Sequence, residues 1–232
     1  MPIDHLIGEL VEALSHEALP ANLEDEADFE RRFVIPTAMR VAARHRDVFM
    51  LSHPFGNKRR CTPDCETAGH EAGRVIGCPT CWKRSKSWAS VAAFGTHHNF
   101  DVVAKDSGRR LAVEIKLVRA RGGRMPNGEL QRFLGQCALA SAKHDAVVGV
   151  CACRGPFDAR WHSDCATVTR WFARRGVHLV FRAIDGRLLC RHGDERGAQA
   201  NKPIHLTAGA SNRGGRSNGS QRARPAAGDR QH

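Results

Sequence analysis

Two acidic residues and a lysine in a predicted β-hairpin carry the clearest chemical signal in the sequence. Residues 100–118, FDVVAKDSGRRLAVEIKLV, are typical of two strands around a tight polar turn. With a two-residue loop at 107–108, Asp101 lies directly across from Glu114, and Lys116 projects from the same face. Opposed carboxylates repel, so the pair indicates a shared divalent cation, as in a metal-dependent nuclease. The alternative is an amphipathic hairpin whose charged face is simply solvated.

Alternation along the second strand of this hairpin also predicts which side chains share a face. One face is expected to carry Leu111, Val113, Ile115 and Leu117, and the other Ala112, Glu114, Lys116 and Val118.

A second candidate site lies in a segment of about 51–88 that is rich in Gly, Pro and basic residues. Its cysteines have the spacing C-x3-C-x12-C-x2-C, which predicts one structural Zn²⁺ bound by Cys61, Cys65, Cys78 and Cys81. His70 is a weaker substitute ligand, and four unlinked cysteines are the alternative. The ion would replace the hydrophobic core that such a small insertion lacks.

Basic residues around these cysteines and after the hairpin favour contact with nucleic acid. They are Lys58, Arg59, Arg60, Lys83 and Arg84, with Trp82 and Trp88 among them, and Arg119, Arg121 and Arg124 in a Gly-rich loop. Arginine and lysine bind phosphates, and aromatic rings stack on bases. A solvated rim around an architectural zinc ion remains the alternative.

The overall charge indicates a polyanionic partner. The chain of 232 residues has 36 Lys and Arg against 24 Asp and Glu, a net charge of +12. Seven basic residues and one acidic residue follow position 195, so this segment contributes +6. The sequence has no apolar segment long enough to predict a membrane span. This favours nucleic acid over a membrane as the partner. Nine cysteines and no recognisable secretory leader predict a reducing, cytoplasmic location.

Hydrophobic periodicity predicts an α/β fold with a mixed central sheet. Helices are expected at 3–17, 26–45, 129–144 and 161–175, and strands at 89–95, 146–152 and 177–181 beside the hairpin. Pro36 should kink or split the second helix. The helix at 129–144 should bury Leu130, Phe133, Leu134, Cys137 and Ala138. The five cysteines outside the zinc set are expected in the core.

Three regions follow from these predictions. Residues 1–24 form an amphipathic helix and linker, 25–195 the main domain with an insertion at about 52–88, and 196–232 a disordered basic tail. The first helix should pack on the core, although a docking or dimer contact is the alternative use.

The order helix, three strands, helix, strand, with Asp101 on the second strand and E-x-K on the third, resembles the PD-(D/E)XK nuclease superfamily over about 25–185. Residues 26–36 look like the first helix of the nuclease domain of type I restriction subunits, and 129–136 like the helix that follows E-x-K. Phe100 stands where the name-giving motif has proline.

The resemblance implies a restriction-endonuclease-like αβββαβ core and Mg²⁺- or Mn²⁺-dependent hydrolysis, with DNA as the default substrate. The metal would be bound by Asp101, Glu114 and the carbonyl of Ile115. Glu30 would position metal or water, with Glu26 as the fallback. Lys116 would orient the attacking water, and Gln136, or else Gln131, would support the site.

Two other interpretations stay open. The protein could be an inactive, zinc-stabilised nucleic-acid-binding protein, or an assembly module of a larger complex that docks through its first helix. A homodimer or a larger complex is compatible with each. His97 and His98 precede Asp101 closely but are left outside the predicted site, because adjacent histidines in a loop are usually exposed.

Overall fold

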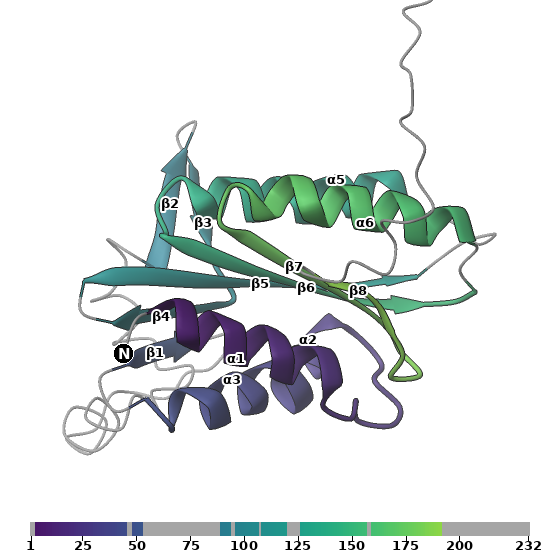
Figure 1. Ribbon diagram of the computed structural model, residues 1–232, viewed down its shortest axis with the longest axis horizontal. Coiled ribbons are helices and arrows are strands. Elements are labelled where there is room, and N and C mark those ends of the chain that lie inside the picture. The colour runs from purple at the N-terminus through teal and green to yellow at the C-terminus, as the bar shows by residue number, and fades with distance from the viewer. Residues whose placement is uncertain are drawn as a thin grey trace, which may run out of the picture. The chain divides into compact units, whose positions relative to one another are not determined.

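The described part of the chain has an α/β fold, in which a mixed six-stranded sheet carries helices on both faces (Figure 1). The computed structural model describes residues 3–45, 48–52, 89–93, 96–106, 108–119, 126–156 and 159–191. The predicted cysteine segment and the predicted basic tail lie outside these residues. No helix in the described ranges has the length and apolar character needed to cross a membrane.

The sheet has the strand order β1-β4-β5-β6-β7-β8. Its strands are β1 (Phe49–Ser52), β4 (Val102–Asp106), β5 (Arg109–Arg119), β6 (Ala146–Arg154), β7 (Val177–Ala183) and β8 (Leu188–Arg191). Neighbours β1, β4 and β5 pair antiparallel, β5, β6 and β7 pair parallel, and β8 returns antiparallel to β7. Strand β6 is buried over nearly its whole length, as its unbroken apolar sequence predicts.

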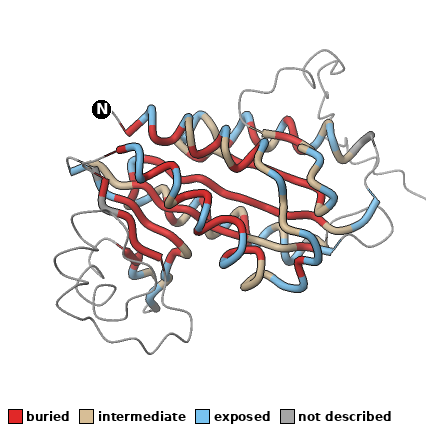
Figure 2. The backbone as a smooth tube through the Cα atoms, turned by 90° about the horizontal axis from the view of Figure 1, so that it is seen from below, coloured by how far each residue is buried: buried red, intermediate tan, exposed pale blue. Residues whose placement is uncertain are grey.

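Two layers of helices cover the sheet. One face carries α1 (Ile3–His16) and a segmented helix made of α2 (Glu26–Phe29), the π-helical turn η1 (Glu30–Val34) and α3 (Ile35–Ala42). The other face carries α5 (Asn127–Ser141) and α6 (Ala159–Ala173). Buried residues therefore run through the middle of the molecule, along the strands and the inner sides of the helices (Figure 2).

The hairpin β4–β5 has the predicted register. Val102 pairs with Val113 and Asp106 with Arg109, as the predicted register requires. Leu111, Val113, Ile115 and Leu117 contact the core under α1 and α3, whereas Ala112 and Val118 belong to the core under α5 and α6. The predicted alternation of faces is thus confirmed for these six apolar residues.

Pro36 splits the predicted helix at 26–45, and it does so through a π-turn. Proline has no N–H to donate to the carbonyl four residues earlier, and its ring crowds that carbonyl. Just before it, the Ile35 N–H donates to the Glu30 carbonyl, five residues back. Such π-turns occur often at functional sites. This one begins at Glu30.

The first strand of the sheet was predicted in the wrong place. Residues 90–93 do form a strand, β2 (Ser90–Ala93), but it pairs with β3 (Thr96–Asn99) in a separate two-stranded sheet. The edge position beside β4 belongs to β1, whose four residues are too few to show periodicity. The predicted insertion consequently follows β1 rather than the first helix.

The helices α1, α5 and α6 and the strands β6 and β7 lie close to their predicted positions. The apolar side of α1, from Ile3 to Leu14, is entirely buried against α3 and the sheet, which confirms core packing. That apolar face is not available as a docking surface. In α5, Ala138 was predicted to be buried but is exposed, and Ala140 is buried instead. Strand β8 was not predicted. Cys137, Cys151, Cys153, Cys165 and Cys190 are all free and buried, as expected.

Replacing Gly149 with alanine should destabilise the sheet beside Glu114. Gly149 is the partner of Glu114 in the β5–β6 ladder. A Cβ atom there would lie 2.6 Å from Cδ2 of Leu179, 2.7 Å from Sγ of Cys137 and 2.9 Å from Cζ of Phe133, all buried. We expect a loss of about 1–3 kcal/mol in the free energy of unfolding, measured by urea denaturation.

Gly135→Ala is the matched control, because Gly135 lies exposed in α5 and an added Cβ atom would meet nothing within 4 Å. Alanine there should stabilise the helix by about 0.5–1 kcal/mol. Equal urea midpoints for the two variants would contradict close packing at Gly149.

Candidate active site

The site forms where β5 continues past the end of β4. The β4–β5 ladder stops at the pair Val102 and Val113, so the following part of β5 has no partner strand on this side among the described residues. Asp101, in the bend before β4, accepts a hydrogen bond from the Ile115 N–H at 2.7 Å through Oδ2. Glu26 Oε2 accepts one from the Leu117 N–H at 3.2 Å. Two carboxylates thus take the place of strand carbonyls.

Residues from five elements meet around a cavity of about 440 Å³ at this edge. It is lined by Glu26, Ala27, Glu30, Asn99, Asp101, Ile115 and Gln136. Four of the predicted site residues are therefore brought together, and the fallback Glu26 joins them. Glu26 and Glu30 are four residues apart, which puts both on one side of the segmented helix. Gln131, the second choice after Gln136, is exposed and does not line the cavity.

Lys116 and Glu114 lie next to this cavity. The Lys116 Nζ atom is 2.7 Å from Glu26 Oε2, and the lysine side chain is only 16% exposed. Glu114 is almost fully buried on the α5 side of the sheet. Its Oε1 atom is 3.7 Å from Nε2 of His98, which comes from β3. The lysine ammonium is thereby fixed among carboxylates.

The carboxyl groups of the site are held in unfavourable surroundings for a negative charge. Burial, with the charges of Asp101 and Glu26, raises the pKa of Glu30 to about 8. Burial and the charge of Glu26 raise the pKa of Glu114 to about 8 as well, although Lys116 opposes this. Burial and Glu114 raise the pKa of Asp101 well above its ordinary value, against the hydrogen bond from Ile115.

Two carboxylate oxygens of the site have unmet hydrogen-bonding capacity. Glu30 Oε1 and Glu114 Oε1 are buried and have no hydrogen-bond partner among the described residues. Buried, repelling and partly unpaired carboxylates are the donor set that a hard divalent cation satisfies. The residues present therefore fit Mg²⁺ or Mn²⁺.

The carboxylates are spread too widely to enclose one ion directly. In the described ranges, only His5, Glu9 and His45 bring three ligand-type atoms within 4.8 Å of one another. An ion among Glu30, Asp101 and Glu114 would thus keep water ligands, as Mg²⁺ commonly does.

His98 and Asn99 are site residues that the sequence did not identify. Burial lowers the pKa of His98, against the opposing charge of Asp101, so a neutral imidazole faces Glu114. Asn99 lines the cavity at the end of β3, whereas His97 is exposed. In the sequence, the only sign that His98 and Asn99 belong to the site is that they closely precede Asp101. The β2–β3 hairpin that positions them was not predicted.

Phe100 stands where the resembled motif has proline, and its side chain packs in the core. The side chain is fully buried, and its ring contacts His98 and His144 edge-on with centroids 5.4 and 4.8 Å apart. The aromatic residue before Asp101 is therefore held in the core under α5 and α6.

The other predicted binding residues fall mostly outside the described part of the chain. These are the cysteines Cys61, Cys65, Cys78 and Cys81 and the basic residues Lys58, Arg59, Arg60, Lys83, Arg84, Arg121 and Arg124. Arg119 is described, and it lies exposed at the end of β5.

Comparison of the chain with protein-family models, with curated proteins and with solved structures finds no match. An assignment of function therefore rests on the fold and the site alone.

Proposed function

We propose that the protein is a metal-dependent nuclease of the PD-(D/E)XK type that hydrolyses phosphodiester bonds, by preference in DNA. The observation that carries the proposal is the group Glu30, Asp101 and Glu114. These carboxyl groups have raised pKa values, and Glu30 and Glu114 each keep an oxygen without a hydrogen-bond partner in the described part of the chain. Carboxyl groups with strongly raised pKa values that lie together are typical of metal-binding and catalytic sites.

The order of elements supports this proposal. A helix precedes the antiparallel strands β1, β4 and β5, and α5 then leads to β6, which pairs parallel to β5. This is the αβββαβ order expected for a restriction-endonuclease-like core. The β2–β3 hairpin and residues 53–88 would be additions between the first and second core strands.

Each residue then has a role set by its position. Asp101 can keep one oxygen on the Ile115 N–H and offer the other to the ion. The Ile115 carbonyl leaves the strand on the same side as its N–H, and Glu114 completes the set. When bound, Mg²⁺ or Mn²⁺ would supply a Lewis acid that stabilises charge on the phosphate and the leaving oxygen. Glu30 would hold water or metal, and Gln136, which lines the same cavity, would support the site.

Lys116 is proposed to orient the attacking water and to offset charge on the phosphorus oxygens. Its ion pair with Glu26 keeps the ammonium group at the cavity rather than in solvent. A fixed cation aimed at developing charge stabilises a transition state more than a mobile one, because it needs no reorganisation. The sequence-based proposal of a Zn²⁺-bound cysteine segment and basic phosphate contacts is compatible with this site.

A cleavage assay on plasmid, linear and single-stranded DNA and on RNA tests the function. The wild-type protein with Mg²⁺ or Mn²⁺ is expected to cut, and EDTA should stop the cutting. Asp101→Asn should be inactive, because it removes the negative charge that would bind the ion, although the amide oxygen can still accept from the Ile115 N–H. Asp185→Asn, at an exposed turn, is the matched control and should keep full activity.

Cutting that survives EDTA, or equal cutting by Asp101→Asn and Asp185→Asn, would reject the proposed site. Binding without cutting on every substrate would instead support the inactive nucleic-acid-binding protein.

A further inference from the structure

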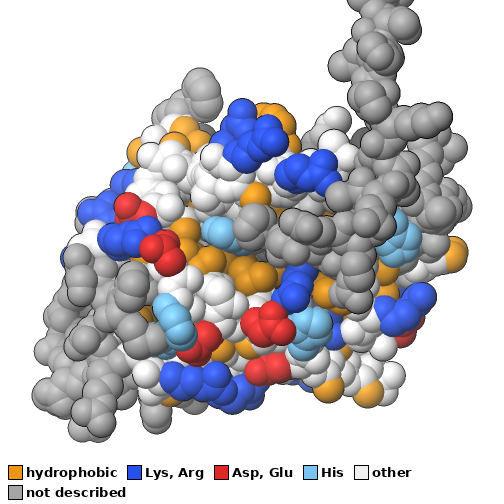
Figure 3. All heavy atoms as spheres, in the orientation of Figure 1, with side chains coloured by type: hydrophobic (Ala, Val, Ile, Leu, Met, Phe, Trp, Pro, Cys, Tyr) orange, Lys and Arg blue, Asp and Glu red, His pale blue; other side chains and the backbone are white. Residues whose placement is uncertain are grey.

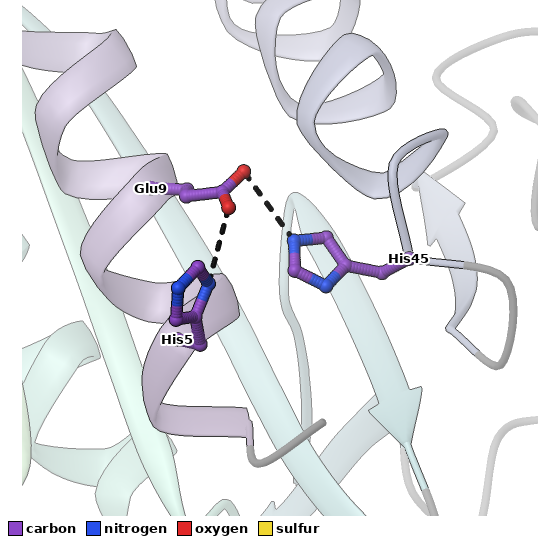
Figure 4. A group of neighbouring side chains, drawn as sticks. All are labelled: His5, Glu9 and His45. Carbon is purple, nitrogen blue, oxygen red and sulfur yellow. Dashed lines mark ion pairs between the residues drawn. The ribbon is translucent and has the colours of Figure 1, made fainter.

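A second cluster of metal-ligand side chains lies on elements that do not contribute to the carboxylate site. His5 and Glu9 are one helical turn apart on α1, and His45 follows the end of α3. His5 Nδ1 is 3.1 Å from Glu9 Oε1, and His45 Nε2 is 3.4 Å from Glu9 Oε2. One ligand atom from each residue lies within 4.8 Å of the others. Figure 4 shows the Glu9 carboxylate between the two imidazole rings.

The cluster contains buried polar atoms without hydrogen bonds. His45 is buried, and neither its Nε2 atom nor Glu9 Oε2 has a hydrogen-bond partner in the described part of the chain. A buried polar atom without a partner destabilises the fold, because it has lost its hydration and gained no hydrogen bond. A ligand that accepts lone pairs from both atoms would remove this cost. His5 is 54% exposed, so an ion could enter from its side.

Glu9 differs from the other acidic residues on the outer side of α1. Asp4 is paired with Arg109, and Glu12 is paired with Arg191 and His16. Glu9 instead faces two histidines, and its remaining neighbour is Arg44, whose Nη1 atom is 3.6 Å from Oε2. The Arg44 side chain is 63% exposed and is free to swing away when a cation binds.

The surface above the cluster leaves room for a further ligand. A shallow hollow of about 760 Å³ is lined by residues of α1 and by Arg44, among them His5 and Glu9. Acidic, basic and histidine side chains are interspersed over this side of the molecule (Figure 3). The hollow is thus open to water.

We propose that His5, Glu9 and His45 bind a divalent transition-metal ion, for which Zn²⁺ is the best match. Two imidazole nitrogens and one carboxylate oxygen are a donor set of Zn²⁺ sites, with water from the hollow as the fourth ligand. Mg²⁺ prefers oxygen ligands only and does not compete well here. The ion would join α1 to the end of α3, and its binding does not depend on nuclease activity.

Zinc uptake by the full-length chain tests the proposal. Metal is first removed, Zn²⁺ is then titrated in excess Mg²⁺, and bound zinc is measured by calorimetry and elemental analysis. The wild-type protein should take up one equivalent more than His5→Gln and than Glu9→Gln. Any zinc bound by the predicted cysteine set is common to all variants and cancels in the difference.

His16→Gln is the matched control, because His16 is an exposed histidine on the same helix that is paired with Glu12. It should bind as much zinc as the wild type. Saturating zinc should also raise the Tm of the wild type and of His16→Gln more than that of His5→Gln. Equal uptake and equal Tm shifts in all four proteins would overturn the proposal. His5 and Glu9 are preferred to the buried His45 for this test because their replacement leaves the core intact.

Discussion

Replacing Lys116 with methionine is expected to slow phosphodiester cleavage about 10²–10⁴-fold without unfolding the protein. Methionine keeps most of the alkyl stem of this largely buried side chain, so packing on β5 is preserved. It removes the ammonium group that Glu26 holds at 2.7 Å beside the cavity. The loss should appear in kcat at saturating Mg²⁺, because Lys116 is not proposed as a metal ligand.

Lys105→Met is the matched control for this loss, since Lys105 is an exposed lysine on β4 of the same hairpin. Its kcat should stay within about twofold of the wild-type value. The kcat of Glu26→Gln should lie between the kcat values of these two variants. The Lys116 ammonium remains in Glu26→Gln, but it is held less firmly. A kcat for Lys116→Met close to that of Lys105→Met would rule out a role for this lysine in catalysis.

The largest expected effect on stability concerns the buried carboxyl groups in metal-free protein. The pKa values of Glu30 and Glu114 are raised from 4.5 to about 8 in the folded state. Between these values the unfolded chain has released protons that the folded protein still binds. Stability therefore falls as pH rises from about 4.5 to about 8, and levels off above that range.

Glu114→Gln should weaken this dependence, because the neutral amide has the same shape and no proton to release. In EDTA at about pH 9 the variant is expected to melt above the wild type, with each kcal/mol equal to about 2–4 °C in Tm. Added Mg²⁺ should raise the wild-type Tm at this pH and have a smaller effect on the variant. Thermal melts across about pH 5–9, with and without Mg²⁺, measure both differences.

Glu129→Gln, an exposed position at the start of α5, is the control for losing one acidic residue. Its Tm should follow the wild-type pH profile. Other groups that titrate in this range, such as His98, are present in all three proteins and cancel in the comparison. Parallel profiles for wild type and Glu114→Gln would contradict the raised pKa of Glu114.

Local patterns predicted the parts of the fold in which one short segment determines its own structure. The turn and the β-branched residues around 107–108 specify the hairpin register, and that register puts Asp101 beside Glu114. The apolar stripe of α1 and the unbroken apolar run of β6 likewise specify which sides are buried. These signals depend on spacing along the chain, so no tertiary information is needed.

The remaining parts depend on contacts between distant segments. Four residues of β1 acquire their strand structure by pairing with β4, more than 50 positions later, and β2 pairs with β3 rather than with the central sheet. Asn99 and His98 reach the site only through that second pairing. Pro36 predicts a break in the helix, but the π-turn that begins at Glu30 also reflects packing on the sheet.

The part of β5 that has no partner strand beside β4 among the described residues has a consequence for solubility. A row of free backbone N–H groups on a strand is a template on which another chain can add a strand, and it promotes aggregation. Asp101 and Glu26 accept hydrogen bonds from the N–H groups of Ile115 and Leu117, so these two donors are not available to an added strand. Asp101 and Glu26 would therefore also oppose self-association of the protein. Replacing both carboxylates together is expected to expose these N–H groups to a strand of a second copy of the chain.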